Sequence, residues 1–544
     1  MAPKLVALLF SFSFLLNLNT ALAAEEDIVD TGYAKYLGNR TFSNAVAYLG
    51  IPYAEPPVGD RRFRAPVPLD TARIAEESSG EIVDATKYPE FCIQGPISAD
   101  NLGGAGSEDC LKMNIYAPSG AKKGDKLPVL VYFHGGGYRY GNPRNWPFDH
   151  WVQQSPNVVI ASVYYRLDVL GFLSHPQFDD PANGDSNAGF LDQIEALRWV
   201  KANIESFGGN PGQVTINGES AGGGSVQYHL VANEDEQLFH GAIAQSVWRA
   251  RAPTPEQQEP LFENFAANAG CGTGEFVEKL ACLRDVDVDT LTRARNEVYN
   301  FDHPYDEFLP VVDGKIIVGH PTSLAEQGKF AKVPLIVGST SNETAARGSS
   351  DNITIALKTS YPGLSDQDIQ DILEVAPASD FNSAAQRFQV VTGESLFICA
   401  RRILGEAYSE ATDTWAYRYN QANPTTGSTT VGHAAENWMM FLGSNTGSNG
   451  SVTFTQMNDV ENAFAEELIA YWLSFVRSGD PNKFKLSRSP EWPQYALEMG
   501  KERVVLQQDS DNSTASSGSY IEQEPEKESR RCEVVASKSE QQQN

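Results

Sequence analysis

Basic residues are few in this sequence compared with acidic ones. Lysine and arginine together number 42, against 70 aspartate and glutamate residues, and the formal net charge is −28. A protein that binds nucleic acid needs a basic surface for the phosphate backbone, so this composition argues against a nucleic-acid partner. A large charge of one sign favours solubility, but it does not identify a substrate.

Long apolar runs are also missing after the N-terminus. Residues 5–16 are apolar, Lys4 precedes them, and the small-residue pattern Ala-Leu-Ala follows at 21–23. This pattern is typical of an export signal with its cleavage site. The run is short for a bilayer span, and the polar residues 537–544 lack the apolar tail of a lipid-anchor signal. We therefore expect a signal peptide at 1–23, a secreted protein, and no membrane anchor.

The sequence has neither a Cys-x-x-Cys nor a His-Glu-x-x-His motif, so it predicts no metal site. Its six cysteines suit an oxidising compartment, and six allow 15 complete pairings. They are Cys92, Cys110, Cys271, Cys282, Cys399 and Cys532. Cys92 and Cys110 are close enough in sequence to close one loop, and so are Cys271 and Cys282. The last two are left for a long-range bridge or as free thiols.

The sequence contains several Asn-x-Ser/Thr sequons, the acceptor motif for N-glycosylation in exported proteins. They begin at Asn39, Asn342, Asn352, Asn449 and Asn512. Each is a candidate glycosylation site if its side chain is exposed.

Apolar segments that predict strands alternate with helical patterns along the chain. Residues 187–207 predict a helix, because their apolar side chains recur at spacings of three and four. Strands are predicted at 127–134, 157–165, 214–217, 241–246, 333–338 and 414–419. Uninterrupted apolar strands separated by helices are typical of a large, mostly parallel central sheet with helices on both faces.

The end of the chain differs in composition. Residues 507–519 are mainly Ser, Asp, Asn and Gly, and residues 523–531 form a run of charges. Both predict a solvated segment. We expect one catalytic domain with insertions at 24–506, followed by a polar, disordered tail at 507–544. A disulfide at Cys532 could attach this tail to the domain.

A nucleophile elbow is the clearest chemical motif. Residues 218–222 read Gly-Glu-Ser-Ala-Gly, with a predicted strand directly before them and a predicted helix directly after. In this motif the serine lies on a strained turn, so its neighbours must be small for strand and helix to pass closely. A structural glycine turn is the alternative, but the flanking strand and helix favour Ser220 as a nucleophile.

A glycine loop follows the predicted strand at 127–134. It reads His-Gly-Gly-Gly at 134–137. Such a loop lets backbone N–H groups point at a developing oxyanion. We expect Gly136 and Gly137 to donate, with the N–H of Ala221 as the third donor.

A nucleophilic serine needs a base, and the base needs an orienting acid. In hydrolases whose serine lies on such an elbow, the chain order is serine, acid, histidine. Only His240, His303, His320 and His433 follow Ser220, and His433 is the best placed because it comes late and after a predicted strand.

The acid is harder to select among 70 acidic residues. Glu343 stands just beyond the predicted strand at 333–338, and active-site loops collect at the carboxyl ends of parallel strands. Asp313 and Glu326 are alternative candidates for the acid, but both are more simply interpreted as surface residues.

These motifs together resemble the type-B carboxylesterase/lipase family, which includes the cholinesterases. The likeness covers about residues 28–495. Its motifs are EDCLKMNIYAP at 108–118, FGG at 207–209, VTI at 214–216, GESAG at 218–222, GIPYA at 50–54, YRL at 165–167, LDQ at 191–193 and WPQY at 492–495. The chain departs from the family pattern at Lys112 and Met113, which lie on a strand away from the chemistry.

The resemblance implies an α/β-hydrolase fold, hydrolysis of a small-molecule ester without metal or organic cofactor, and a triad of Ser220, Glu343 and His433. It also implies disulfides Cys92–Cys110 and Cys271–Cys282, and in some members a late bridge that Cys399–Cys532 would match. A glycan on Asn342, next to the triad acid, would obstruct the site, so we expect Asn342 to be buried and unmodified.

The sequence disfavours three other functions. Lipases or sterol esterases of this family have a long lid in the first disulfide loop, whereas residues 93–109 here are short, polar and rich in glycine. Cholinesterases hold choline on aromatic faces, and this loop has no Trp, Tyr or Phe. Adhesion proteins on the same fold have lost triad residues, which are present here. The sequence therefore favours an esterase for soluble, shorter-chain or aromatic esters.

Overall fold

The structure is a computed structural model of the chain. It describes residues 27–96, 103–232, 236–299, 301–343, 352–423, 425, 427–446, 452–496, 498 and 500–544. The expected signal peptide lies outside these residues. Among the helices described, none is long and apolar enough to cross a membrane.

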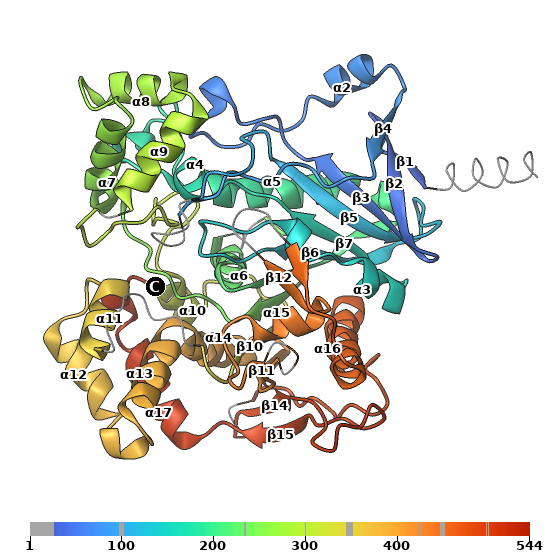
Figure 1. The fold of residues 1–544 in the computed structure, drawn as a ribbon, viewed down its shortest axis with the longest axis vertical. Helices are drawn as coiled ribbons and strands as arrows, with labels where there is room; N and C mark the ends of the chain where they lie inside the picture. The colour runs from blue at the N-terminus through green and yellow to red at the C-terminus, as the bar shows by residue number, and fades with distance from the viewer. Residues whose placement is uncertain are drawn as a thin grey trace, which may run out of the picture.

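One large sheet runs through the molecule (Figure 1). Its order is β1-β2-β3-β5-β7-β6-β8-β9-β10-β11-β14-β15, with β4 paired to β2. The strands are β1 (Ile28–Asp30), β2 (Lys35–Phe42), β3 (Ala45–Pro52), β4 (Ile82–Ala85), β5 (Lys112–Pro118), β6 (Leu127–Phe133), β7 (Val159–Val163), β8 (Gly209–Glu219), β9 (Gly241–Gln245), β10 (Leu335–Thr340), β11 (Thr414–Tyr419), β14 (Glu502–Leu506) and β15 (Tyr520–Gln523). The pairs from β7 through β14 are all parallel, and antiparallel pairs occur at both ends. The expected mostly parallel sheet is confirmed.

Both faces of the sheet are buried, as the apolar strands predicted. On β6, Val129, Val131 and Phe133 belong to one core cluster, and the alternate residues Leu130 and Tyr132 belong to another. This alternation follows from the period of two along a strand.

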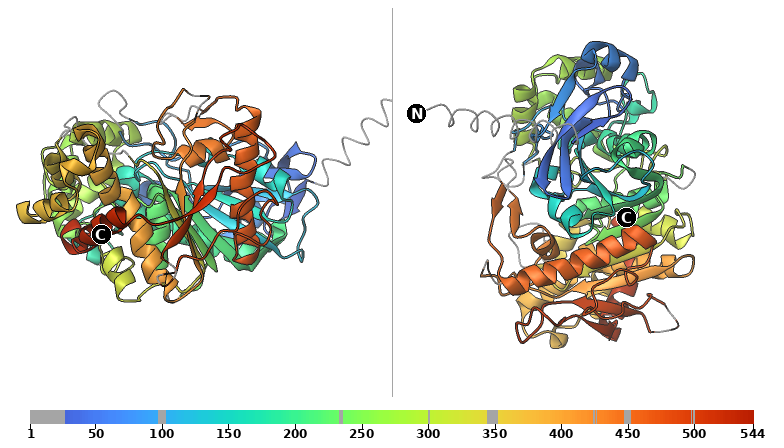
Figure 2. Two further views of the ribbon diagram at one scale, coloured as in Figure 1. Left: turned by 90° about the horizontal axis from the view of Figure 1, so that it is seen from below. Right: turned by 90° about the vertical axis from the view of Figure 1, so that its right-hand side faces the viewer.

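Helices cover the two faces separately. Helix α5 (Ala188–Asn203) and helix α6 (Ala221–Ala232) contribute to the first cluster. Helix α16 (Asp459–Ser478) contributes to the second, and Figure 2 shows it lying along one side of the sheet. The predicted helix at 187–207 corresponds to α5.

Two groups of helices lie to one side of the strands (Figure 1). The first is α7 (Pro255–Asn268), α8 (Phe276–Asp285) and α9 (Val288–Val298). The second is α11 (Ile353–Ser360), α12 (Asp366–Glu374) and α13 (Ala384–Gly393), joined through a π-helical turn, η6 (Glu394–Ile398), to α14 (Cys399–Ser409).

The segment 507–544 differs from the expected disordered tail. It adds strand β15 to the sheet and continues as α17 (Glu526–Ala536) and α18 (Ser539–Gln542). Its charge run is not a solvated face, because its carboxylates pair with arginines from distant parts of the chain. Arg401 contacts Glu524 at 2.7 Å, and Arg503 contacts Glu528 at 2.7 Å.

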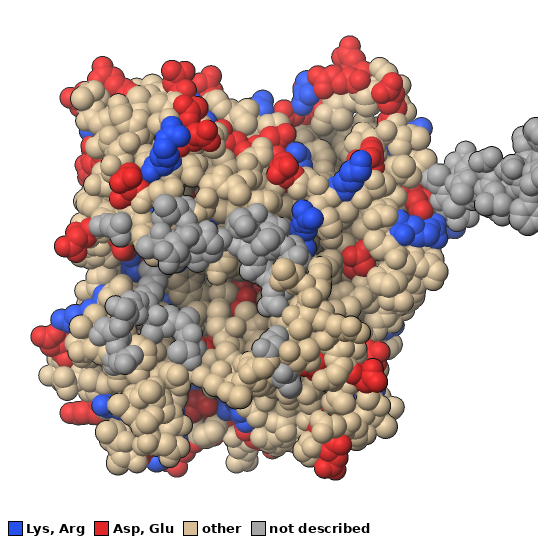
Figure 3. Space-filling view, in the orientation of Figure 1, with Lys and Arg blue, Asp and Glu red and all other residues tan. Residues whose placement is uncertain are grey.

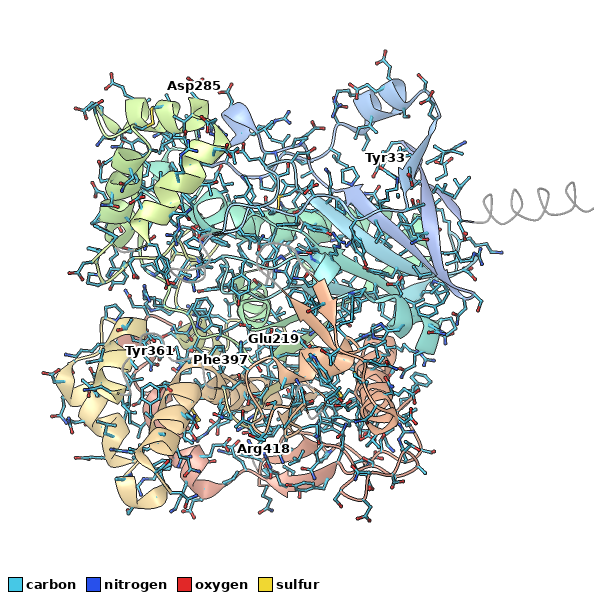
Figure 4. The ribbon with its side chains drawn as sticks, in the orientation of Figure 1. Tyr33, Glu219, Asp285, Tyr361, Phe397 and Arg418 are labelled. Carbon is cyan, nitrogen blue, oxygen red and sulfur yellow. A yellow bond between two sulfur atoms is a disulfide. The ribbon has the colours of Figure 1, made fainter. Side chains whose placement is uncertain are left out.

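These ion pairs are buried or half-buried. Burial acts to raise the pKa of Glu528, but Arg503 and Arg401 outweigh it and lower that pKa to about 2. Arg418, labelled in Figure 4, pairs in the same way with Glu522 at 2.7 Å. Composition alone missed these partners because they are far away in sequence.

The structure has disulfides Cys92–Cys110, Cys271–Cys282 and Cys399–Cys532. The last of these, left open by the sequence, joins α14 to α17 across 133 residues.

The sequons differ in exposure. Asn39, Asn352 and Asn512 are exposed, and Asn449 lies outside the described residues. Asn342 is half-buried rather than buried, which corrects the expectation that burial would shield it. Whether any of them carries a glycan stays a prediction.

Candidate active site

Ser220 occupies a sharp turn between β8 and α6. Its φ of 60° lies in the left-handed region, which a residue other than glycine rarely adopts. A Cβ on Gly218 would lie 2.4 Å from the backbone of Gly222, and one on Gly222 would lie 2.1 Å from the carbonyl oxygen of Phe133. Both glycines of the motif are therefore required by close backbone approach, as an elbow demands.

His433 lies between Ser220 and Glu343. Its Nε2 is 2.8 Å from the Ser220 Oγ, and its Nδ1 is 2.5 Å from the Glu343 Oε2. Since a carboxylate can only accept, Nδ1 carries the proton and Nε2 is left to accept from the serine hydroxyl. The three residues follow different strands: Ser220 comes directly after β8, Glu343 follows β10, and His433 lies in the segment between β11 and α15 (Ala435–Met440).

Glu343 is fully buried, and the carboxylate oxygen that does not face His433 also accepts hydrogen bonds. Its Oε1 accepts from the backbone N–H of Thr340 at 2.7 Å and from the hydroxyl of Ser246 at 2.5 Å. The rival acids lie elsewhere, since Asp313 accepts from Asn187 and from nearby backbone N–H groups and Glu326 is exposed.

The glycine loop lies beside the nucleophile. A Cβ on Gly135 would be 3.0 Å from the Cβ of Ser220. Gly136 and Gly137 have φ of 110° and 64°, and a Cβ on Gly136 would lie 2.0 Å from the Tyr140 carbonyl oxygen. Ala221 begins α6, and N–H groups in the first turn of a helix have no partner within it. The loop and the helix start both adjoin Ser220, and the assignment of their N–H groups as oxyanion donors stays a prediction.

Two further buried carboxylates, those of Glu219 and Glu436, act on the imidazole, and neither was predicted from the sequence. The Oε1 of Glu219, labelled in Figure 4, is 3.3 Å from the His433 Nε2, and its Oε2 accepts from the Asn437 amide at 3.2 Å. Glu436 accepts from the Tyr417 hydroxyl at 3.1 Å. Nothing local in the sequence marks these glutamates as buried, although Glu219 lies inside the serine motif.

Burial and neighbouring charge shift the pKa values of this cluster. Burial raises the pKa of Glu219 to about 8 and that of Glu436 to about 7. For His433, burial acts to lower the pKa, but Glu219 and Glu343 outweigh it and raise the value to about 9. The imidazole therefore holds its proton more tightly than an ordinary histidine.

The face of the molecule seen in Figure 3 has its charges spread rather than gathered. On the face in Figure 3, lysine and arginine side chains are interspersed with aspartate and glutamate. Among the described residues, no group of His, Cys, Asp and Glu could hold a metal ion.

The sheet order, the elbow after a central parallel strand and the Ser-His-Glu arrangement define an α/β-hydrolase. Comparison with known proteins adds the family. The model of the "Carboxylesterase family" matches residues 25–527. The chain belongs to this family.

Several relatives extend over most of the chain. Carboxylesterase 1D from Mus musculus is 30% identical over 509 residues, which cover 86% of each chain. Acylcarnitine hydrolase from Mus musculus is 32% identical over 485 residues, covering 82% of this chain and 81% of that one. The crystal structure of EstA from Aspergillus niger has a TM-score of 0.82 and 31% identity, and the match covers 95% of this chain and 99% of that one. The protein is a carboxylic ester hydrolase.

Proposed function

We propose that this protein is a secreted serine carboxylesterase that cleaves soluble esters through an acyl-Ser220 intermediate. One observation carries the proposal: hydrogen bonds run without interruption from the Ser220 hydroxyl through His433 to the buried Glu343. This chain of contacts is what a serine needs to become a nucleophile once the imidazole is neutral.

In the first half of the reaction, the Ser220 Oγ attacks the ester carbonyl while the His433 Nε2 takes its proton. The Nδ1–H of His433 donates to Glu343, which fixes the tautomer and stabilises the imidazolium that forms. The imidazolium then gives its proton to the departing alcohol, and acyl-Ser220 remains. In the second half, His433 activates a water molecule that releases the acid.

The oxyanion formed at each stage is assigned to three backbone donors, the N–H groups of Gly136, Gly137 and Ala221. Preorganised donors of this kind lower a barrier by about 3–4 kcal/mol each. The mechanism draws on no metal and no organic cofactor.

An esterase for soluble substrates is favoured over a lipase. The loop closed by Cys92 and Cys110 is short and lacks aromatic residues, so it makes a poor lipid-binding flap and a poor choline site. The non-catalytic adhesion function is disfavoured because all three triad residues are present and lie in hydrogen-bonding contact.

Secretion is supported by the sequence of residues 1–23 and by the disulfides, which form in oxidising compartments. Asn39, Asn352 and Asn512 are exposed and suit glycosylation.

A fluorophosphonate probe tests the proposal directly. We expect it to label the purified protein on the peptide that contains Ser220, and hydrolysis of chromogenic esters to fall as the acyl chain lengthens. Mapping the label by mass spectrometry identifies the residue. Absence of labelling in a folded sample would favour the adhesion function, and a preference for emulsified long-chain triglyceride would favour a lipase.

The pH dependence provides a separate prediction. The acid limb of kcat/KM against pH reports the deprotonation of the free enzyme's base. The Glu219 carboxylate lies 3.3 Å from the His433 Nε2 and, of the charges near the imidazole, acts most to raise the pKa of His433. We expect Glu219→Gln to lower the His433 pKa and move the acid limb to lower pH by about one unit.

A matched control is Glu467→Gln, because Glu467 is also buried with a raised pKa but bonds to Ser517 and Ser519. Its profile should overlay the wild type. An acid limb that stays in place or moves upward in Glu219→Gln would contradict the role given to Glu219.

A further inference from the structure

Phe397 lies against the imidazole of His433. The ring centroids are 4.4 Å apart and the ring planes are tilted by 43°. Phe397 is 3% exposed, so its ring is held inside the protein rather than resting on a surface. Figure 4 labels it together with Glu219, and both residues contact His433.

The two triad hydrogen bonds of His433 act at the edge of its ring, so its faces are held by packing. They fix Nε2 toward Ser220 and Nδ1 toward Glu343. Rotation about the Cβ–Cγ bond would swing both nitrogens out of line with these partners. Hydrogen bonds weaken steeply with such misalignment. A ring packed against the imidazole face blocks that rotation.

The backbone around His433 offers little regular support. His433 lies in the irregular segment between β11 and α15, and the next residue, Ala434, has a φ of 61°. Side-chain contacts must therefore hold the ring.

We propose that Phe397 is a positioning residue for His433, keeping the imidazole in line with Ser220 and Glu343. This inference rests on the proposed function, because it assigns Phe397 to the base of that reaction. Phe397 itself makes no contact with the reacting atoms in this role.

The turn that carries Phe397 is held from the nucleophile side. It is the π-helical turn η6, and π-helical turns inside α-helices occur frequently at functional sites. Arg249 donates to the carbonyl oxygen of Ser395 through Nη1 and to that of Leu396 through its backbone N–H, both at 2.9 Å. Arg249 follows Ser246, the serine that donates to Glu343, by three residues. The same loop thus supports the acid and the turn bearing Phe397.

The turn is also held from the C-terminal side. Glu394, its first residue, pairs with Arg531 of α17 at 2.6 Å. Cys399, directly after the turn, is disulfide-bonded to Cys532 of the same helix. Gly393, directly before it, packs so closely that an added Cβ would lie 3.1 Å from the Glu343 carbonyl oxygen. Each end of the turn is therefore fixed, which suits an element that must hold one ring in place.

The test compares Phe397→Ala and Phe397→Leu with Leu396→Ala. Leu396 is the neighbouring buried residue in the same turn and the same core cluster, so its truncation leaves a cavity without uncovering the imidazole. Each variant is measured for kcat and KM with a soluble chromogenic ester, for its rate of fluorophosphonate labelling, and for Tm.

We expect Phe397→Ala to lower kcat and the labelling rate by about 10- to 100-fold, the size of effect that misplacement by about 1 Å produces. KM should change by less than about threefold, since ground-state binding is not affected. Phe397→Leu, which still covers the imidazole face with apolar atoms, should recover part of the loss. Leu396→Ala should lower Tm as much as Phe397→Ala while keeping kcat within about threefold of the wild type.

Equal losses of kcat in Phe397→Ala and Leu396→Ala, following Tm, would show that Phe397 only fills the core. A rise in KM at constant kcat would instead place it in substrate binding, and the positioning role would be wrong. Ser220→Ala distinguishes the two proposals. If labelling depends on Ser220 but Phe397→Ala reacts at the wild-type rate, only the positioning role fails; if labelling does not depend on Ser220, the proposed function fails and this role with it.

Discussion

Replacing Ser220 by alanine is expected to lower kcat for a soluble ester by about 10⁶-fold, the loss seen when a serine nucleophile is removed from a triad. The acyl-enzyme can no longer form, and the residual rate comes from substrate binding and the oxyanion donors. KM should change little, because the hydroxyl contributes to the transition state rather than to the ground state. Steady-state kinetics together with the loss of fluorophosphonate labelling measure this effect.

Ser225→Ala is the matched control. Ser225 is buried on the same helix, α6, but its hydroxyl accepts from Gln193 at 3.0 Å and not from the triad. The control should lose about 1 kcal/mol of stability and keep its activity. If Ser220→Ala retained a substantial part of the wild-type rate, ester hydrolysis would have to come from another residue.

Glu343→Gln is expected to lower kcat by about 10⁴-fold, the effect of an amide in the acid position of a triad. The Oε1 of Glu343 receives a fixed backbone N–H from Thr340, so the amide oxygen of glutamine must occupy that position. Its NH₂ group then faces the His433 Nδ1, which has to accept instead of donate. Nε2 consequently carries the proton and cannot take one from Ser220.

Glu436→Gln is the control for this substitution. Glu436 is buried in the same cluster and accepts from Tyr417, while the contact with the His433 Nδ1 is made by Glu343. We expect it to lower kcat by less than about tenfold. Comparable losses in the two variants would mean that the total charge of the cluster matters and that orientation by Glu343 does not.

The sequence predicted the sheet and the position of the serine because both depend on local patterns. The apolar segment 127–134, for example, corresponds to β6. The small residues around Ser220 are required by close contacts of the motif. Glu343 and His433 were selected from chain order, position after a strand and family likeness. The structure brings these residues into contact, while their catalytic roles stay a proposal.

Other parts of the site and fold depend on contacts between distant segments, which composition does not reveal. Glu219 and Glu436 were missed as neighbours of His433 because their burial results from the packing of the sheet and α15. The segment 507–544 was expected to be solvated because it is polar, yet buried arginines such as Arg401 make its carboxylates part of the fold. A polar segment is therefore predicted to be disordered only if no residues of opposite charge elsewhere in the chain can pair with it.

The bond between Cys399 and Cys532 also bears on how the protein should be produced. It closes a covalent ring of chain that contains His433, whereas Ser220 and Glu343 lie outside the ring. A reducing bacterial cytoplasm would leave the segment that carries His433 without this tether, and a loop of this length contributes about 4–5 kcal/mol in the chain-entropy picture. A yeast or periplasmic host that oxidises thiols is therefore the appropriate choice, and low activity from a cytoplasmic preparation should be traced to its thiol content before it is attributed to the chemistry of the site.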